Sequence, residues 1–218
     1  MIDARVFTVG PVQENCYLVR QAGADRAVIV DPGDEAPRLL QAAERLGVTI
    51  EAILLTHTHF DHIGAVAPVA RATGAPVWCP QIEAPVLLDI MRYVPWPGFG
   101  PFENHRAEHL ISGGERLSLA GIDFDVVLTP GHSPGHVTYA VAGGADGSPP
   151  ALFSGDVLFR GSIGRTDLPF GDHARLLQSI AELLDAYPDE TVVHPGHMGL
   201  TTLGAERASN PFLEALAR

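Results

Sequence analysis

Residues 56–62, Thr-His-Thr-His-Phe-Asp-His, constrain this chain more than any other stretch. Their potential metal ligands are His57, His59, Asp61 and His62. The apolar residues 52–55 precede them, and a short apolar run that ends in polar residues is typical of a buried strand delivering its last residues to a sheet edge. Buried imidazoles need partners, so packing alone explains three of them poorly. Because neutral imidazoles and carboxylates are the usual ligands of Zn(II), Fe(II) and Mn(II), the segment predicts an open metal site.

The composition is that of an ordinary soluble globular chain, with 46% hydrophobic and 18% charged residues in 218. We therefore expect one domain over residues 1–218. The net charge of −12 repels a phosphate backbone, so no nucleic-acid partner is expected. The N-terminus does not resemble a secretory signal, and no apolar stretch approaches the roughly 20 residues that span a bilayer. We expect a cytoplasmic protein with no membrane partner, in which Cys16 and Cys79 are reduced core thiols.

Short runs of β-branched and apolar residues, bounded by Gly, Pro or Asp, predict strands in two batches. Apolar residues at helical spacing predict amphipathic helices over residues 35–46 and 63–73, and a further helix that ends before Pro188. These elements indicate an α+β fold with two packed sheets and helices outside. The expected strands cover residues 6–9, 15–19, 27–31, 52–56, 115–119, 124–128, 137–141, 151–153 and 191–194.

Residues 80–114 carry both aromatic residues and chain breakers and follow no regular period. A packed loop is one interpretation. The other is a lid or pocket wall inserted in the domain at about residues 80–114, because long irregular segments in compact domains often line binding sites.

Three later strand ends also finish in residues that bind metals. They are His132 in Thr-Pro-Gly-His, Asp156 in Phe-Ser-Gly-Asp and His197 in His-Pro-Gly-His. Each follows an apolar run and a glycine turn, as the histidine segment follows its own strand. The carboxyl ends of several strands are therefore expected to supply one site.

His-x-His-x-Asp-His, followed by a lone His, a lone Asp and a final His, resembles the metallo-β-lactamase superfamily over nearly the whole chain. The resemblance implies a four-layer αβ/βα sandwich with metals at one edge between the sheets. It also implies two divalent metal ions, with zinc expected and iron or manganese as alternatives. One metal is expected on His57, His59 and His132, the second on Asp61, His62 and His197, and Asp156 between them.

Asp156 and the segment around Gly164-Arg165-Thr166-Asp167 are most similar to the short bacterial glyoxalase II-like, or hydroxyacylglutathione hydrolase-like, hydrolases. The best-known β-lactamases have a cysteine near this point and are exported. We expect Arg165 and Asp167 to brace the loop that carries Asp156; a solvated ion pair in a tight turn is the alternative. Asp31, in Asp-Pro-Gly, is a similar supporting candidate.

The remaining histidines are not predicted ligands. His136 is expected to satisfy a backbone group rather than line the pocket, and His194 is expected to be buried support. His173 is expected at the surface, opening a helix that Asp172 caps.

The resemblance implies a metal-dependent hydrolase that cleaves an acyl-glutathione-type thioester by attack of a metal-bound hydroxide. Asp61 and Asp156 are the predicted catalytic residues, and Asp61 would also hold the hydroxide in line. The chain ends 21 residues after His197. We therefore expect no basic C-terminal extension like that of longer glyoxalase II enzymes, and the resemblance defines the substrate less well than the chemistry. A small-molecule substrate is expected, and the oligomeric state is open.

The same residues suit other functions. A single Fe(II) on His57, His132 and Asp156 would form a two-histidine, one-carboxylate triad, as in a persulfide dioxygenase. Lactone or other ester hydrolysis and a non-catalytic metal-binding scaffold are further alternatives, since this fold supports many reactions.

Overall fold

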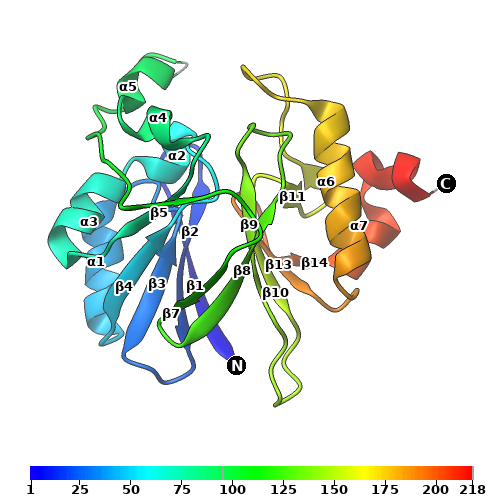
Figure 1. The fold of residues 1–218 in the computed structure, drawn as a ribbon, viewed down its shortest axis with the longest axis horizontal. Coiled ribbons are helices and arrows are strands. Elements are labelled where there is room, and N and C mark those ends of the chain that lie inside the picture. Colours follow the sequence, from blue (N-terminus) through cyan, green and yellow to red (C-terminus); the bar gives the residue numbers. More distant parts are fainter. Residues whose placement is uncertain (95, 218) are drawn as a thin grey trace. The chain divides into compact units, whose positions relative to one another are not determined.

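The computed structural model describes residues 1–94 and 96–217, which form two compact units (Figure 1). The N-terminal unit comprises Ile2–Ile111 and Ser118–Ile122, and the C-terminal unit comprises Met1, Ser112–Leu117 and the residues from Asp123 onward. The structure contains two six-stranded sheets, so the prediction of two sheets is confirmed.

The sheet of the N-terminal unit has the strand order β1-β2-β3-β4-β5-β6. Its first three strands pair antiparallel, and the next strands join in parallel. The central strands β3 and β4 are mostly apolar. The strands are β1 (Ile2–Val9), β2 (Glu14–Gln21), β3 (Arg26–Val30), β4 (Thr49–Leu54), β5 (Val77–Pro80) and β6 (His109–Ile111).

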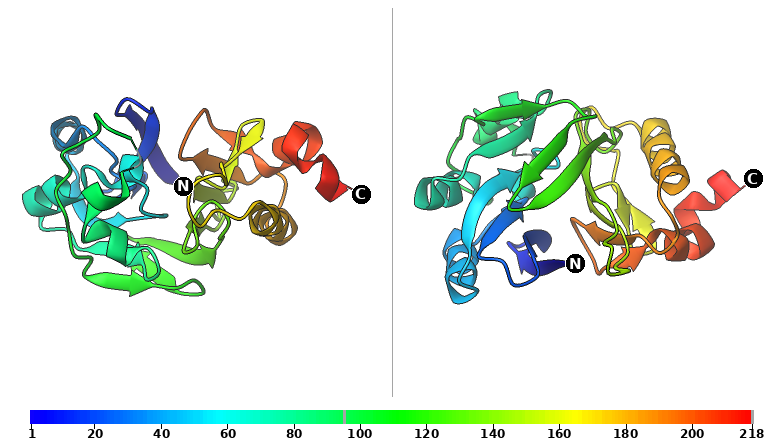
Figure 2. Two further views of the ribbon diagram at one scale, coloured as in Figure 1. Left: turned by 90° about the horizontal axis from the view of Figure 1, so that it is seen from above. Right: turned by 60° about the horizontal axis from the view of Figure 1, so that its bottom comes forward.

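Two helices of the N-terminal unit, α1 (Ala36–Arg45) and α3 (Val66–Thr73), lie along one face of this sheet (Figure 2). Their apolar side chains join those of the strands in one core. The helix predicted over residues 35–46 is confirmed. The one predicted over residues 63–73 is instead divided, because α2 (Phe60–Ile63) ends before α3 begins.

Part of the segment expected to be irregular has regular structure. It contains the single-turn helices α4 (Ala84–Leu87) and α5 (Ile90–Tyr93), and it ends in β6. Elements of three or four residues leave no readable period in a sequence, which is why the spacing did not reveal them. The role of this segment as a lid or pocket wall stays a prediction.

The sheet of the C-terminal unit has the strand order β14-β13-β10-β9-β8-β7. β10 and β13 pair in parallel, whereas β8, β9 and β10 pair antiparallel. A small hairpin of β11 and β12 follows β10. The strands are β7 (Arg116–Leu119), β8 (Ile122–Leu128), β9 (Val137–Val141), β10 (Ala151–Gly155), β11 (Leu158–Phe159), β12 (Ser162–Ile163), β13 (Val192–Pro195) and β14 (Thr201–Thr202).

Helix α6 (His173–Ala186) packs against this sheet through the apolar stripe that its spacing predicts. Leu176, Ile180 and Leu183 are buried, together with Leu152 and Val193 of the sheet. Helix α7 (Leu203–Ser209) and a 3₁₀ helix (Pro211–Ala217) follow β14. Among residues 1–94 and 96–217, no helix is both long and apolar enough to span a bilayer.

Each unit contains one pair of neighbouring parallel strands whose carboxyl ends lead to predicted site residues. In the N-terminal unit, β3 leads to Asp31 and β4 leads to His57. In the C-terminal unit, β10 leads to Asp156 and β13 leads to His197. The carboxyl ends of parallel neighbours lie at the same edge of a sheet, so the residues of each pair come together.

Candidate metal centre

The histidine segment lies between β4 and α2 in the N-terminal unit. His57 and His62 are fully buried, and His59 is half-buried at the N-terminus of α2. The ring centroids of His57 and His62 are 4.2 Å apart, and those of His57 and His59 are 4.8 Å apart. The three imidazoles therefore form one compact group, as their spacing predicts.

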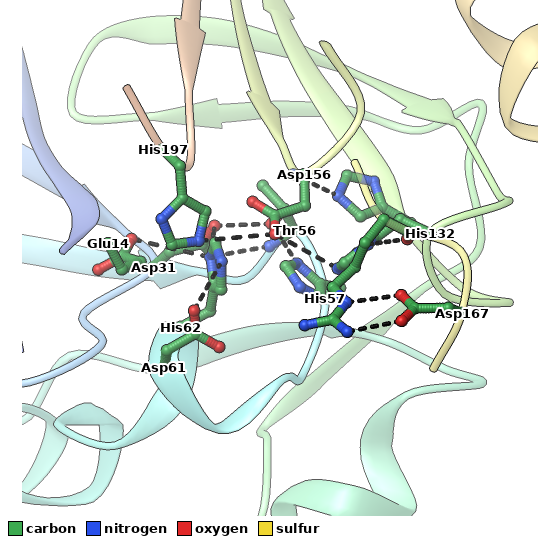
Figure 3. Close-up of polar contacts among 12 residues, drawn as sticks. Glu14, Asp31, Thr56, His57, Asp61, His62, His132, Asp156, Asp167 and His197 are labelled. Carbon is green, nitrogen blue, oxygen red and sulfur yellow. Dashed lines mark hydrogen bonds and ion pairs between the residues drawn. The ribbon is translucent and has the colours of Figure 1, made fainter. Parts of the chain in front are cut away.

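Asp31 is the polar centre of this group (Figure 3). It is buried, and its backbone has a positive φ of 48° in the turn after β3. One carboxylate oxygen accepts a hydrogen bond from the backbone N–H of Thr56 at 2.8 Å. The other accepts from the Thr56 hydroxyl at 2.6 Å and lies 3.0 Å from Nδ1 of His62. Asp31 therefore contacts one predicted ligand directly and a second one through Thr56.

These contacts fix the tautomers of both histidines. A carboxylate only accepts, so Nδ1 of His62 must carry the proton in its contact with Asp31. The single hydroxyl proton of Thr56 goes to Asp31, so Oγ1 of Thr56 must accept from Nδ1 of His57, 3.0 Å away. In the neutral imidazoles the lone pair then lies on Nε2, the atom that would bind a metal.

The surroundings of His62 are strongly acidic. Besides Asp31, the buried Glu14 has a carboxylate oxygen 3.7 Å from Nδ1 of His62, and an oxygen of Asp61 lies 3.8 Å from its Nε2. Three carboxylates around one imidazole favour a cation there, because buried negative charges are costly unless they are offset.

Nitrogen and oxygen atoms of Asp31, His57 and His62 also lie close enough together to hold a metal by themselves. The hydrogen bonds argue against that arrangement. Both oxygens of Asp31 already accept hydrogen bonds, and its contacts are on the Nδ1 side of the two rings. These contacts support the prediction that Asp31 orients the ligands, which stays a prediction.

Gly33 in the same turn could not be another residue. A Cβ atom there would lie 1.7 Å from the backbone carbonyl oxygen of Asp61 and 2.6 Å from a carboxylate oxygen of Glu14. The turn after β3 therefore lies directly against the start of α2, which keeps Asp31 and Asp61 in a fixed relation.

The C-terminal unit places two predicted histidine ligands beside a third predicted ligand, Asp156. An oxygen of Asp156 lies 3.4 Å from Nε2 of His132 and 3.6 Å from Nε2 of His197. His132 and Asp156 are buried, and His197 is partly exposed. A carboxylate oxygen placed between two imidazole nitrogens can contact a cation held by either ring.

His132 is held by a tight turn and a backbone carbonyl. Gly131 has a φ of 139°, and a Cβ atom there would lie 2.3 Å from the backbone nitrogen of Leu176, so the turn lies against α6. Nδ1 of His132 lies 2.8 Å from the carbonyl oxygen of Arg165. A carbonyl only accepts, so the proton is on Nδ1 and the lone pair is on Nε2, as in His57 and His62.

His136 fixes the backbone of Asp156. Its Nε2 accepts a hydrogen bond from the backbone N–H of Asp156 at 3.1 Å, and its Nδ1 lies 3.1 Å from the Thr129 hydroxyl. The prediction that this buried histidine satisfies a backbone group is confirmed.

Arg165 and Asp167 form a bidentate ion pair with two contacts of 2.7 Å, and both side chains are largely exposed. Arg165 holds the pKa of Asp167 down at about 2. The contact from Arg165 to a predicted ligand runs through its backbone carbonyl to His132. That their side chains brace the Asp156 loop stays a prediction.

The residues predicted to be structural are found in structural positions. His194 is buried and stacks on Phe153, with ring centroids 4.7 Å apart, and burial lowers its pKa to about 4. Asp172 accepts from the backbone N–H of Arg175 and caps α6, whose first residue, His173, is exposed. Cys16 and Cys79 are free thiols, and burial raises the pKa of each.

Three buried partners of the histidine segment were missed by the sequence analysis. Glu14 and Thr56 contact His62 and His57, and Glu83 accepts a hydrogen bond from the hydroxyl of Thr58 at 2.9 Å. Glu14 and Glu83 are far from the segment along the chain, and an isolated Glu carries no motif. Thr56 directly precedes the first histidine, and a second Thr-His pair follows at Thr58-His59. This repeated pair was a signal in the sequence that the threonines contact the site.

Comparison with known proteins bears directly on this geometry. The sequence model of the metallo-beta-lactamase superfamily matches residues 9–197. Hydroxyacylglutathione hydrolase GloC of Haemophilus influenzae is 35% identical, over 98% of this chain and 99% of that protein.

Two solved structures are similar over nearly the full length. The BLEG-1 B3 metallo-beta-lactamase has a TM-score of 0.88 and 41% identity, over 98% of this chain and 100% of that one. TTHA1623 in a di-iron-bound form has a TM-score of 0.83 and 43% identity, over 96% of this chain and 100% of that one. These matches confirm the predicted α+β fold class of the metallo-β-lactamase type.

Proposed function

Because the chain belongs to the metallo-β-lactamase superfamily, we propose that it is a glyoxalase II-like thioesterase acting on acyl-glutathione-type thioesters. Membership makes it a metallo-hydrolase of this superfamily. The finer assignment rests on the full-length similarity to a hydroxyacylglutathione hydrolase. It agrees with the inert setting of both buried cysteines, because this hydrolysis requires no protein nucleophile.

We further propose that seven residues hold two divalent cations. His57, His59 and His132 would hold one, Asp61, His62 and His197 the other, and Asp156 would bind both. The proposal is supported within each unit by the Nδ1 protons fixed on His57, His62 and His132, and by the position of Asp156 beside His132 and His197. Zinc is the proposed metal. The relative crystallised with two iron ions makes iron the first alternative to test.

When bound, the cations would lower the pKa of a water molecule and withdraw charge from the thioester carbonyl. The residues of this chain would position the reactants. Asp61 would accept a hydrogen bond from the attacking water and hold it in line with the carbonyl carbon, while Asp156 would keep the two metal positions at a fixed separation. The new C–O bond forms as the C–S bond breaks, and the leaving thiolate takes up a proton, giving a carboxylic acid and a thiol.

The test is metal content together with two assays on protein purified without added metal. About two metals per chain, release of thiol from S-lactoylglutathione and no oxygen uptake with glutathione persulfide are expected. About one iron per chain with oxygen uptake would replace the proposal with the dioxygenase. Metal with neither activity would direct the search to lactones and other esters.

Hydrolysis of a cyclic amide is a second candidate, because the BLEG-1 B3 metallo-beta-lactamase is 41% identical to this chain. The same arrangement of water and carbonyl would serve a β-lactam ring. Measuring kcat/KM for a chromogenic cephalosporin and for S-lactoylglutathione with one preparation separates the two. We expect the thioester to be the better substrate. A larger kcat/KM for the cephalosporin would reverse the assignment.

A further inference from the structure

A cavity of about 350 Å³ lies within the N-terminal unit beside Asp61. Its walls come from the β1–β2 turn, the turn after β3, the start of α2 and residues 98–102. The volume is at the lower end of the range of small-molecule sites, about 300–1,000 Å³, and is suited to a single small chemical group. The metal ligands alone do not account for this space.

One wall of the cavity is aromatic, and Phe60 is its centre. The ring centroid of Phe60 lies 4.8 Å from that of Phe99 and 6.1 Å from that of Phe102. Phe60 directly precedes Asp61, so the aromatic wall begins at the residue next to a proposed metal ligand. Aromatic faces at this position favour contact with apolar or aromatic groups.

Gly64 allows the wall to close. A Cβ atom at this position would lie 2.6 Å from the ring of Phe102 and 2.4 Å from the backbone carbonyl oxygen of Gly33. The ring of Phe102 therefore lies directly on the backbone of the turn between α2 and α3.

The charge of the cavity has one sign. Asp34 and Asp61 line it, and none of the described residues around it is Arg, Lys or His. Asp34 lies against Gly10, with a carboxylate oxygen 3.1 Å from the position of a Cβ atom on Gly10. A carboxylate that enters beside Asp34 would meet a like charge, whereas Asp61 would be offset by the cation it is proposed to hold, so exclusion of anions rests on Asp34.

We propose that this cavity binds the acyl group of the thioester and selects uncharged apolar acyl groups, branched or aromatic, over acyl groups that carry a carboxylate. The proposal rests on the thioesterase function and names its substrate class. Glutathione itself carries two carboxylates, so the acidic cavity suits the acyl side of the bond and not the thiol side. Phe99 and Phe102 are then specificity-determining residues, and Asp34 is the residue that excludes anions.

Binding can be measured without turnover by using thioethers, whose C–S bond is not hydrolysed. Isothermal titration of the metal-loaded full chain would compare S-benzylglutathione, S-methylglutathione and S-carboxymethylglutathione. Phe99→Ala and Phe102→Ala should each lower the affinity for S-benzylglutathione about tenfold, because the aromatic contact is lost. The affinity for S-methylglutathione should not change. Asp34→Asn should raise the affinity for S-carboxymethylglutathione severalfold, because a like charge is removed.

The matched control is Phe7→Ala, which removes a partly buried ring from the same core but from outside the cavity. It should lower stability without changing the affinity for any of the three thioethers. Equal affinity of the wild type for the benzyl and methyl compounds would overturn the proposal. So would an equal loss of S-benzylglutathione affinity in Phe7→Ala and Phe99→Ala.

Turnover separates this proposal from the thioesterase function itself. The wild type should hydrolyse S-phenylacetylglutathione with a kcat/KM at least tenfold above that for S-succinylglutathione, and Phe99→Ala should reduce the ratio. Hydrolysis of both substrates at similar rates would overturn the cavity assignment and leave the thioesterase function intact. If neither these two substrates nor S-lactoylglutathione is hydrolysed, the thioesterase function fails, while loss of S-benzylglutathione binding in Phe99→Ala would still support an apolar site.

Discussion

The two units present their proposed ligands in different ways. In the N-terminal unit all four lie within residues 57–62, and a buried carboxylate, Asp31, orients two of them. In the C-terminal unit three ligands follow three separate strands, β8, β10 and β13. Their orienting groups are uncharged: the carbonyl of Arg165 holds His132, and the imidazole of His136 holds the backbone of Asp156.

This difference has an electrostatic consequence. A carboxylate and a carbonyl both orient the imidazole and raise its basicity, but the full negative charge of the carboxylate does so more strongly. Substitution of an orienting group should therefore cost metal affinity in the N-terminal unit and mainly folding stability in the C-terminal unit. The variants below test that contrast, from the largest expected effect to the smallest.

Asp156→Ala should abolish activity, with a loss in kcat/KM of at least about a thousandfold, because it removes the carboxylate proposed to bind both cations. Metal content, thiol release and circular dichroism would be measured together. Asp185→Asn, at an exposed position of α6, serves as the control and should keep its metals. Full activity of folded Asp156→Ala would contradict the site assignment.

Asp31→Asn should weaken zinc binding by about 10–100-fold, the range found when the partner of a ligand histidine is replaced. The amide keeps the shape of the side chain but lacks its charge. Chelator competition would measure the affinity, with the exposed Glu35→Gln on the next turn as control. Unchanged zinc affinity would show that the negative charge of Asp31 does not contribute to metal binding by His57 and His62.

His194→Phe should flatten the pH dependence of unfolding of the metal-free chain. Burial lowers the pKa of His194 to about 4. As the pH falls from about 6.5, the unfolded chain therefore binds a proton before the folded chain does, and stability is lost until about pH 4. Between about pH 6.5 and pH 4, the free energy of unfolding of the wild type should fall by up to about 3 kcal/mol more than that of the variant. Parallel urea titrations at pH 7 and pH 4.5 would detect it.

His136→Leu should lower the free energy of unfolding by about 1–3 kcal/mol, because the backbone N–H of Asp156 loses its acceptor in a buried site. Zinc affinity of the folded variant should change much less than in Asp31→Asn. His136→Gln, which can still accept a hydrogen bond, should recover part of the stability. A loss of metal affinity as large as that of Asp31→Asn would remove the distinction between the units.

Arg165→Ala should have the smallest effect, a change in kcat/KM of less than about threefold, since an exposed ion pair contributes little and the backbone carbonyl that contacts His132 remains. Steady-state kinetics with S-lactoylglutathione would measure it. A tenfold loss with normal folding would show that the side chains brace the Asp156 loop, as the sequence analysis predicts.

The different placement of the ligands in the two units also explains which of them could be predicted from the sequence. The ligands of the N-terminal unit are adjacent in the chain, so spacing alone indicated a metal site. Those of the C-terminal unit were recognised as single residues after strands, and only the family resemblance connected them. Glu14 and Glu83 were missed because their contacts join distant positions, and α4 and α5 because single turns have no period. The division of the helix predicted over residues 63–73 falls where Gly64 lets Phe102 approach.

The fixed Nδ1 protons of His57, His62 and His132 have a further consequence. Each points to an acceptor inside the protein and not to solvent, so these three protons should exchange slowly and give separate low-field resonances even in metal-free protein. The chain would then hold its imidazoles in the metal-binding tautomer before any metal arrives. Loading would then require no change of tautomer at these rings.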